Sequence, residues 1–328
     1  MINFLVIFLL SFIINELIRK SNFLPNFSGD LHQRFSSENN VSLAGGIIFL
    51  VFFTLFFFDN LKIIFFSFFF IFLLGLLSDK KKIKSPNIRF FFQLIICLFL
   101  VIFGDLEILS TRIEIFDRFI SYQFINIIFV SFCILIIING SNFIDGLNTL
   151  ALGYYLIIIF VLNYLGLELF FEKKLLIYIL LSLILLNFFN RLFLGDSGTY
   201  LIGLVFSFLL IKFHMSYELI SPYFIVLLLW YPAFEILFSI IRKILQNKSP
   251  MFPDNLHLHQ LIFEKINKAV NKKIFSNIIT AFILNFYNLI VLFIGSNFMY
   301  YTKSLIFIIL SNVFIYLLTY YFFYKKIH

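Results

Sequence analysis

Eleven long apolar runs follow one another along this 328-residue chain, separated by short polar segments. A helix of about 20 apolar residues spans the hydrocarbon core of a bilayer. The chain is therefore predicted to fold as one all-α integral membrane domain over residues 1–328, a bundle of about 11 helices. The helices are expected near residues 1–18, 43–58, 62–78, 88–104, 119–138, 149–166, 174–189, 199–213, 221–242, 274–294 and 303–324.

Two boundaries refine this pattern. Only residues 59–62 separate the second and third runs, so these are expected to form a tight helical hairpin. The first run, residues 1–18, has its basic residues Arg19 and Lys20 after it and not before it. It is therefore expected to be a first membrane helix and not a cleaved signal peptide.

Composition excludes an ordinary water-soluble fold. Hydrophobic residues make up 62% of the chain and charged residues 13%, with a mean hydropathy of +1.02, whereas soluble domains are nearer half apolar and a quarter charged. The 52 phenylalanines are expected mainly to face lipid. Cys97 and Cys133 each lie in an apolar run without a neighbouring His or Cys, so neither a disulfide nor a zinc site is predicted.

The Lys and Arg positions orient the bundle, because basic residues in short loops are retained on the cytoplasmic side. With the N-terminus outside and the C-terminus in the cytoplasm, 18 of the 25 basic residues fall on the inner side. The net charge of +8 thus lies beside membrane spans, which favours lipid headgroups and phosphate-bearing substrates over nucleic acid. The seven outer residues are Lys62, Arg112, Arg118, Lys173, Lys174, Lys212 and Lys303.

Acidic residues gather on the predicted inner side. Asp79, Asp145, Asp196 and Asp254 each fall in an inner loop, where a carboxylate beside the membrane is costly unless it is used or hydrated. An active face is therefore expected there. Its predicted segments are residues 30–46, 78–89, 139–149, 190–199 and 243–273.

The first polar motif contains Asn139, Asn142, Asp145 and Gly146. The first three are spaced three apart, so at a helix end their polar groups would share one face. Amides beside a carboxylate can hold a nucleotide or a phosphate-bound metal, while a plain polar helix cap is equally consistent with the spacing.

The second motif, residues 193–199, places Gly195 and Gly198 around Asp196 at the start of the eighth run. Such a loop can direct a carboxylate and backbone N–H groups at a diphosphate and Mg²⁺. Asp196 or Ser197 acting as a simple helix N-cap is the alternative.

The third and fourth motifs add basic and imidazole groups. His257 and His259 follow Asp254 in the long inner loop, without a third ligand at zinc spacing, so phosphate binding or substrate orientation is favoured. Arg89 and Gln93 are four apart and so share one helix face, where the forked donors of Arg89 suit a phosphate.

The order of these motifs resembles the polyprenyl-phosphate N-acetylhexosamine-1-phosphate transferase family, which includes the phospho-MurNAc-pentapeptide translocase of peptidoglycan synthesis. NGSNFIDGLNTLA resembles its Asn-x-x-Asn-x-x-Asp-Gly segment, FLGDSGTYLIG its Phe-x-Gly-Asp-x-Gly segment, and SPMFPDNLHLHQLIF its Pro-Asp-x-x-His-x-His loop. The likeness runs from about residue 30 to 265. The His-x-His loop points to the undecaprenyl-phosphate N-acetylglucosamine-1-phosphate transferase branch.

The resemblance implies transfer of N-acetylhexosamine 1-phosphate from a UDP-sugar to undecaprenyl phosphate, with release of UMP, as the initiating step of a cell-envelope glycan in the bacterial inner membrane. It implies Mg²⁺ or Mn²⁺ as cofactor and leaves a homodimer open. By similarity, Asp79 and Asp145 are catalytic and Asp196 binds the metal. The implied substrate-binding residues are Asn139, Asn142, Phe193, Arg89, His257 and His259.

Three positions depart from the family pattern: Ser78 replaces one of a pair of aspartates, Asn148 replaces an Asp and Gln260 a His. Ser78 therefore keeps open a catalytically impaired relative that binds a lipid or a partner. A transporter is the other alternative, but it predicts charged groups deep in helices of both membrane halves. Only Glu235 and Asn285 lie well inside predicted spans, while the acidic and His motifs collect on one face. Glu235 could line a substrate groove or pair within the bundle.

Overall fold

The computed structural model describes residues 3–25, 41–250 and 254–327, and within these ranges it contains helices and no strands. Outside the described residues lie part of the predicted inner segment 30–46 and residues 251–253. The latter belong to the loop before α12 that carries His257, called the His loop below. The elements are α1 (Phe4–Ser21), α2 (Gly45–Leu61), η2 (Lys62–Ile64), α3 (Phe65–Asp79), α4 (Pro86–Phe103), α5 (Glu114–Ile120), α6 (Gln123–Ile144), α7 (Leu150–Tyr164), α8 (Lys173–Phe188), α9 (Gly195–Ser216), α10 (Pro222–Leu228), α11 (Trp230–Leu245), α12 (Leu258–Val270), α13 (Lys273–Ser296) and α14 (Thr302–Ile327).

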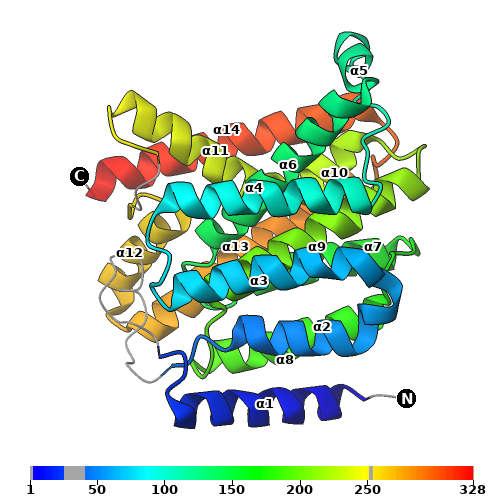
Figure 1. Cartoon of the computed structure of the whole chain (residues 1–328). Coiled ribbons are helices and arrows are strands. Elements are labelled where there is room, and N and C mark those ends of the chain that lie inside the picture. The colour runs from blue at the N-terminus through cyan, green and yellow to red at the C-terminus, as the bar shows by residue number, and fades with distance from the viewer. Residues whose placement is uncertain (1–2, 26–40, 251–253, 328) are drawn as a thin grey trace.

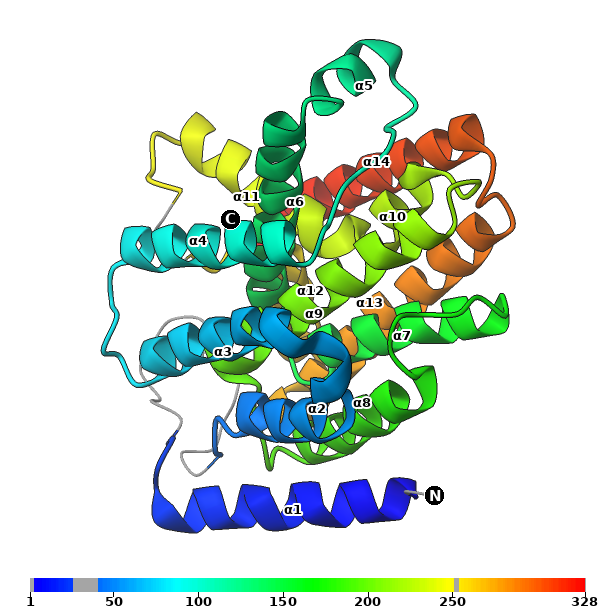
Figure 2. The ribbon, with the colours of Figure 1, turned by 45° about the vertical axis from the view of Figure 1, so that its right-hand side comes forward.

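The all-helical prediction is confirmed for the described chain, and every predicted apolar run forms helix. Six helical segments are long and apolar enough to cross a membrane, with α2 through α3 taken as one, and seven if α10 and α11 form one span. The chain reverses at η2, so α2 and α3 run side by side as the expected hairpin (Figures 1 and 2).

Helix α9 lies at the centre of the bundle and is buried along most of its length. It packs against α3, α6 and α2. Close approach depends on Gly75 of α3, because a Cβ there would lie 2.4 Å from Cα of Ser197. The amino end of α9 is thereby held against α3, which matters because Asp196 lies in the first turn of α9.

Two predicted boundaries were wrong. The fifth run was expected to end at residue 138, but α6 continues to Ile144 and carries Asn139 and Asn142 on its last two turns. Gly140 would weaken an isolated helix. Here its lack of a side chain lets α6 pack on the backbone of α11, since a Cβ would lie 2.3 Å from the carbonyl oxygen of Pro232. Packing therefore overrides local propensity.

The ninth run, residues 221–242, was expected to be one helix, but α10 and α11 meet at a bend of 74°. Pro232 lies in the first turn of α11, where the ring replaces a backbone donor. The hydroxyl of Tyr154 donates to the carbonyl of Leu228 at 2.9 Å and accepts from the N–H of Tyr231 at 3.4 Å. This side chain satisfies backbone groups that the break leaves without helical partners.

The two ends of the bundle differ in what they carry (Figure 1). The carboxyl end of α1, the α3–α4 connection, α12 and the end of α14 lie at one end. The amino end of α1 and helix α5 lie at the other. All four polar motifs belong to elements or connections at the first end.

Candidate active site

The carboxylate of Asp79 joins the end of α3 to the start of α9. Its Oδ1 accepts the backbone N–H of Asp196 at 2.7 Å, and its Oδ2 accepts that of Ser197 at 3.0 Å. Gly195 makes this possible, because it has φ +69° and a Cβ there would lie 2.8 Å from Asp79 Oδ2. Asp79 thus binds the otherwise unpaired amides of a helix N-terminus.

Asp196 is surrounded by donors from three helices. Its Oδ2 accepts from Ser78 Oγ at 2.5 Å and from Arg89 Nη1 at 3.0 Å. Its Oδ1 accepts from Asn142 Nδ2 at 2.7 Å. Arg89 also donates to Ser78 Oγ at 2.8 Å, so Ser78 lies between the cation and the carboxylate. The structure therefore brings together four residues that are distant in sequence.

The predicted shared face of Arg89 and Gln93 on α4 is confirmed. Arg89 contacts Asp196, and Gln93 Oε1 accepts from Asn139 Nδ2 at 2.8 Å. Asn139 also donates to the carbonyl of Leu135 within its own helix. Asn139 is therefore held by α4, one turn before the residue that contacts Asp196.

Asp145 follows the end of α6, and its carboxylate has no hydrogen-bond partner among the described residues. Burial, together with the neighbouring carboxylates of Asp196 and Asp79, raises the pKa of Asp145 well above its ordinary value. Three carboxylates are thus close enough to disfavour one another's charge. Arg89 is the cation paired with one of them.

The carboxylate oxygens of Asp145 and Asp196 are of the kind that Mg²⁺ prefers. In the described part of the chain, no group of three or more His, Cys, Asp or Glu side chains is arranged to enclose a metal. Mg²⁺, however, is usually held by one or two carboxylates together with substrate phosphates and water. Asp145, whose carboxylate is unpaired, and Asp196 would supply two such carboxylates, while a closed zinc site is not present in the described ranges.

Phe193 is placed by its backbone. Its N–H donates to the carbonyl of Ser42 at 2.9 Å, and its carbonyl accepts from Gly45 at 3.0 Å. The side chain is half-buried. A Cβ at Gly45 would lie 2.7 Å from Cα of Leu194, so the start of α2 approaches this segment closely.

His257 lies at the amino end of α12 and reaches both α11 and α6. Its Nδ1 is 3.0 Å from Oε1 of the buried Glu235. Its ring meets Phe143 edge to face at 5.0 Å between centroids and stacks on His259 at 5.6 Å. The His loop therefore packs against the segment between Asn142 and Asp145.

His259 is fully buried, and neither ring nitrogen has a hydrogen-bond partner among the described residues. Burial lowers the pKa of His259 to about 3, so the ring is neutral near pH 7. It lies against Gly146, where a Cβ would be 2.4 Å from Nε2. A buried ring without partners is what a polar ligand or water would satisfy.

Asp254, in the same loop, forms an ion pair with Arg242 of α11. Its Oδ2 is 2.9 Å from Nη1 of the buried Arg242. Burial alone would raise the pKa of Asp254. The hydrogen bond from Arg242 and the neighbouring basic side chains outweigh burial and lower that pKa. Asp254 therefore anchors the His loop to α11.

Asn148, one of the departures from the family pattern, is hydrogen-bonded to residues of α13 and of the end of α8. Its backbone N–H donates to Asn277 Oδ1 at 2.7 Å, and its Nδ2 donates to the carbonyl of Asn187 at 3.0 Å. It also contacts Asn190 Oδ1. These bonds brace the segment after Asp145 against α8 and α13.

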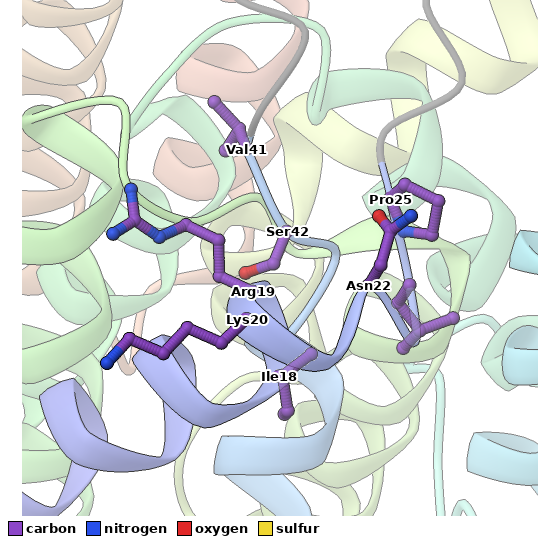
Figure 3. Close-up of a pocket in the computed structure, with 8 residues that line it drawn as sticks. Ile18, Arg19, Lys20, Asn22, Pro25, Val41 and Ser42 are labelled. Atoms are coloured by element: carbon purple, nitrogen blue, oxygen red, sulfur yellow. The ribbon is translucent and has the colours of Figure 1, made fainter.

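A separate hollow lies between the carboxyl end of α1 and residues 41–42 (Figure 3). Arg19 and Lys20 extend from one wall, and Asn22 and Pro25 form another. The described chain stops at Pro25 and resumes at Val41. The hollow thus borders residues outside the described ranges and carries no assigned role.

Sequence reasoning missed several partners in this region. Tyr200 lies one turn after Asp196 and donates to its Oδ2 at 3.4 Å. Tyr316, on α14, donates to Glu235 Oε2 at 2.9 Å, so Glu235 pairs within the bundle. Nothing in the sequence marked these two, because the chain has 16 tyrosines, mostly in apolar runs.

Comparison with known proteins shows where the chain has relatives. Residues 61–214 match the family described as glycosyl transferase family 4. An undecaprenyl-phosphate alpha-N-acetylglucosaminyl 1-phosphate transferase of Thermotoga maritima is 25% identical over 265 residues, which cover 80% of this chain and 81% of the relative.

Two further relatives cover less of the chain. A probable undecaprenyl-phosphate N-acetylglucosaminyl 1-phosphate transferase of Bacillus subtilis is 30% identical over 206 residues, or 58% of this chain and 54% of the relative. A decaprenyl-phosphate N-acetylglucosaminephosphotransferase of Mycolicibacterium smegmatis is 32% identical over 154 residues, or 39% and 38%.

Proposed function

We propose that this glycosyl-phosphate transferase, of which residues 61–214 match glycosyl transferase family 4, transfers N-acetylhexosamine 1-phosphate from a UDP-sugar to undecaprenyl phosphate. The proposed products are undecaprenyl-diphospho-sugar and UMP, and the reaction would initiate a cell-envelope glycan. One observation carries the proposal. Asp79, Asp145 and Asp196 gather with Arg89 and Asn142 at one end of the bundle.

The proposed reaction is a direct displacement at phosphorus. An oxygen of the lipid phosphate forms a bond to the sugar-linked phosphorus of the donor, and the bond from that phosphorus to the UMP oxygen breaks. Nucleophile and electrophile are both anionic, so charge neutralisation matters more than a strong base. Arg89 is the cation beside the carboxylate cluster, and His257 is a second candidate for contacting a phosphate.

Asp196 and Asp145 are the residues proposed to hold Mg²⁺, or Mn²⁺ in its place. A bound divalent cation would neutralise charge on the diphosphate and so favour both attack and departure of UMP. Asp196 is oriented for this by Ser78, Arg89 and Asn142. Asp145 contributes a carboxylate with no other described partner.

The remaining residues are proposed to bind the donor and position the machinery. Asn142 with Asp145 would cradle the nucleotide sugar, and Asn139 would support them from the same helix. Phe193 would lie near the uracil, while His257 and His259 would bind the phosphate-bearing part of the donor. Asp79 keeps its predicted catalytic role near the lipid phosphate, and its contacts with the start of α9 support a positioning function.

The proposed setting is the cytoplasmic membrane of a bacterium, crossed about eleven times with the N-terminus outside. α5 and α12 lie at opposite ends, which is consistent with an outer loop and an inner loop (Figure 1). The basic residues around α12 and the active face would then lie in the cytoplasm, where UDP-sugars are found.

A purified enzyme assay tests the proposal. The protein, in detergent with undecaprenyl phosphate and Mg²⁺, is given UDP-N-acetylglucosamine, UDP-N-acetylgalactosamine or UDP-glucose, and UMP and lipid-linked sugar are quantified. UMP and lipid product are expected in equal amounts with an N-acetylhexosamine donor. Asp59→Asn, which alters an exposed carboxylate at the α2–η2 turn, is the control expected to retain activity.

Two outcomes would contradict the proposal. Release of UMP without lipid product would indicate a hydrolase. No turnover with any donor, in protein that remains folded and binds undecaprenyl phosphate, would favour the catalytically impaired relative. The intact network around Ser78 argues against that second outcome, because Asp196 keeps both a hydroxyl donor and a cation.

A further inference from the structure

A buried carboxylate on α11 connects the His loop to the C-terminal helix. Glu235 is 1% exposed, and both of its oxygens are used. Oε1 lies 3.0 Å from His257 Nδ1 and accepts the N–H of Leu258 at 3.3 Å. Oε2 accepts the hydroxyl of Tyr316 at 2.9 Å. Burying a carboxylate in an apolar helix is costly, so complete pairing of this kind indicates a use.

We propose that Glu235 and Tyr316 are positioning residues that fix the ring of His257 for contact with the donor diphosphate, an inference that rests on the proposed transferase function. A carboxylate on Nδ1 selects the tautomer with its proton on that nitrogen and sets the direction of Nε2. Nε2, the other ring nitrogen, is then the atom available to a phosphate oxygen, to which it donates when it carries a proton.

The surroundings of His257 restrict the orientation of its ring. Nε2 lies 3.6 Å from Asp254 Oδ1, and Asp254 is itself paired with Arg242. Phe143 meets the ring edge to face, and His259 stacks on it. Phe143 lies two residues before Asp145, so the ring stands beside the segment proposed to cradle the nucleotide sugar.

Tyr316 fixes the carboxylate in turn. It is 2% exposed, and its ring packs edge to face on Phe234 at 4.9 Å and on Phe238 at 5.4 Å. Its hydroxyl therefore has little freedom to leave Glu235. Since α14 lies outside residues 61–214, the inference gives the C-terminal helix a part in the reaction.

A double-mutant cycle tests whether Glu235 acts through His257. We expect Glu235→Gln to lower kcat by about 10- to 100-fold, with a smaller change in the KM for undecaprenyl phosphate. In the His257→Ala background the same substitution should cost less than about threefold, because the residue it positions is gone. Equal losses in the two backgrounds, with both proteins folded, would overturn the proposal.

The hydroxyl of Tyr316 has a matched control one turn along α14. Tyr316→Phe removes a hydroxyl bonded to a carboxylate and should lower kcat about tenfold. Tyr320→Phe removes a buried hydroxyl that has no hydrogen-bond partner in the described part of the chain, and should leave kcat unchanged. Unchanged kcat in both variants would overturn the assignment of Tyr316.

A spectroscopic readout separates this inference from the proposed function. In ¹⁵N-histidine NMR spectra, the signal lost in His257→Ala identifies the ring, and wild type should show it protonated at Nδ1. Glu235→Gln should shift that signal toward the other tautomer. An unchanged signal would refute the positioning role even if transfer is observed. A shifted signal without transfer would support the positioning geometry while the proposed reaction fails.

Discussion

The backbone N–H of Asp196 donates a hydrogen bond of 2.7 Å to the carboxylate of Asp79, so one acidic residue holds the helix turn that carries the other. The side chain of Asp196 is then directed at Ser78, Arg89 and Asn142. Two aspartates with similar sequence signals therefore have different surroundings. Asp79 faces backbone amides, and Asp196 faces side-chain donors.

Ser78→Ala should weaken the hydrogen bonding of Asp196 without removing the bonds from Arg89 and Asn142. The hydroxyl both donates to Asp196 and accepts from Arg89, and each such bond to a charged group is worth about 1.5–3 kcal/mol. We expect turnover to fall about tenfold. Ser67→Ala on the same helix is the control, because the Ser67 hydroxyl is buried without a described partner. Equal activity of both variants and wild type would mean that Ser78 does not orient Asp196.

Asp196→Asn should abolish metal-dependent turnover while the protein still inserts and folds. An amide cannot replace a carboxylate as a Mg²⁺ ligand at comparable affinity, and it would face the Arg89 guanidinium with less charge. Activity titrated with Mg²⁺ and Mn²⁺, and thermal unfolding of each protein, check this. A metal optimum and kcat like those of wild type would remove Asp196 as the ligand.

Acid should destabilise the protein through His259. Its folded pKa of about 3 lies below the unfolded value of about 6.5, so the unfolded chain binds more protons between these values. Stability is thus fully present above about pH 6.5 and falls as pH decreases, by at most about 1.4 kcal/mol per pH unit for this group. His259→Gln should flatten that slope. The free energy of unfolding is measured for wild type and for His259→Gln from pH 4.5 to 7. A difference between the two proteins that does not change with pH would contradict the role of His259.

Opposite labelling of two exposed positions would test the proposed orientation. Glu107→Cys lies in the segment before α5, and Asn271→Cys follows α12. In intact cells an impermeant maleimide should label the first and not the second, because α12 is proposed to lie in the cytoplasm. Wild type, with Cys97 buried and Cys133 half-buried, sets the background. Labelling of both positions from outside would reject the topology.

The apolar pattern predicted the helices well because each long run must satisfy its backbone within itself in a membrane. It failed where tertiary contacts decide. The local sequence did not indicate that α6 would continue through Gly140, because the helix continues there by packing closely on Pro232 of α11. At the break near Leu229, the backbone groups are likewise satisfied by Tyr154, a residue on another helix.

Candidate polar residues were found because charge is rare in such a chain, but their partners were not. The sequence marked Asp79, Arg89, Asn142 and Asp196 separately, and the structure joins them. The sequence alone could not distinguish Asp79, which binds backbone amides, from Asp196, which binds side-chain donors. The partner of Glu235 was also hidden, because Tyr316 is one tyrosine within an apolar helix.

The surroundings of Asp79 bear on whether the reaction passes through a covalent phospho-aspartate. Both Asp79 oxygens already accept backbone hydrogen bonds, and attack on phosphorus would require at least one to leave its amide. A carboxylate is also a weak nucleophile toward an anionic diphosphate, whereas the lipid phosphate is itself ionised. We therefore expect direct attack, with both substrates bound together.

Asp79→Asn separates the two routes. The asparagine side chain has a single acceptor oxygen, so it can bind only one of the two amides and the start of α9 should loosen. Turnover should fall by about 10²–10⁴-fold, as when a positioned acid–base group is lost. UDP-sugar binding should change little, because the donor is proposed to contact Asn142, Phe193 and the His loop. In a single-turnover assay of wild type without lipid, no UMP should be released, since the nucleophile is absent. A burst of UMP equal to the enzyme, with labelled sugar phosphate retained on Asp79 and no burst in Asp79→Asn, would establish the covalent route instead.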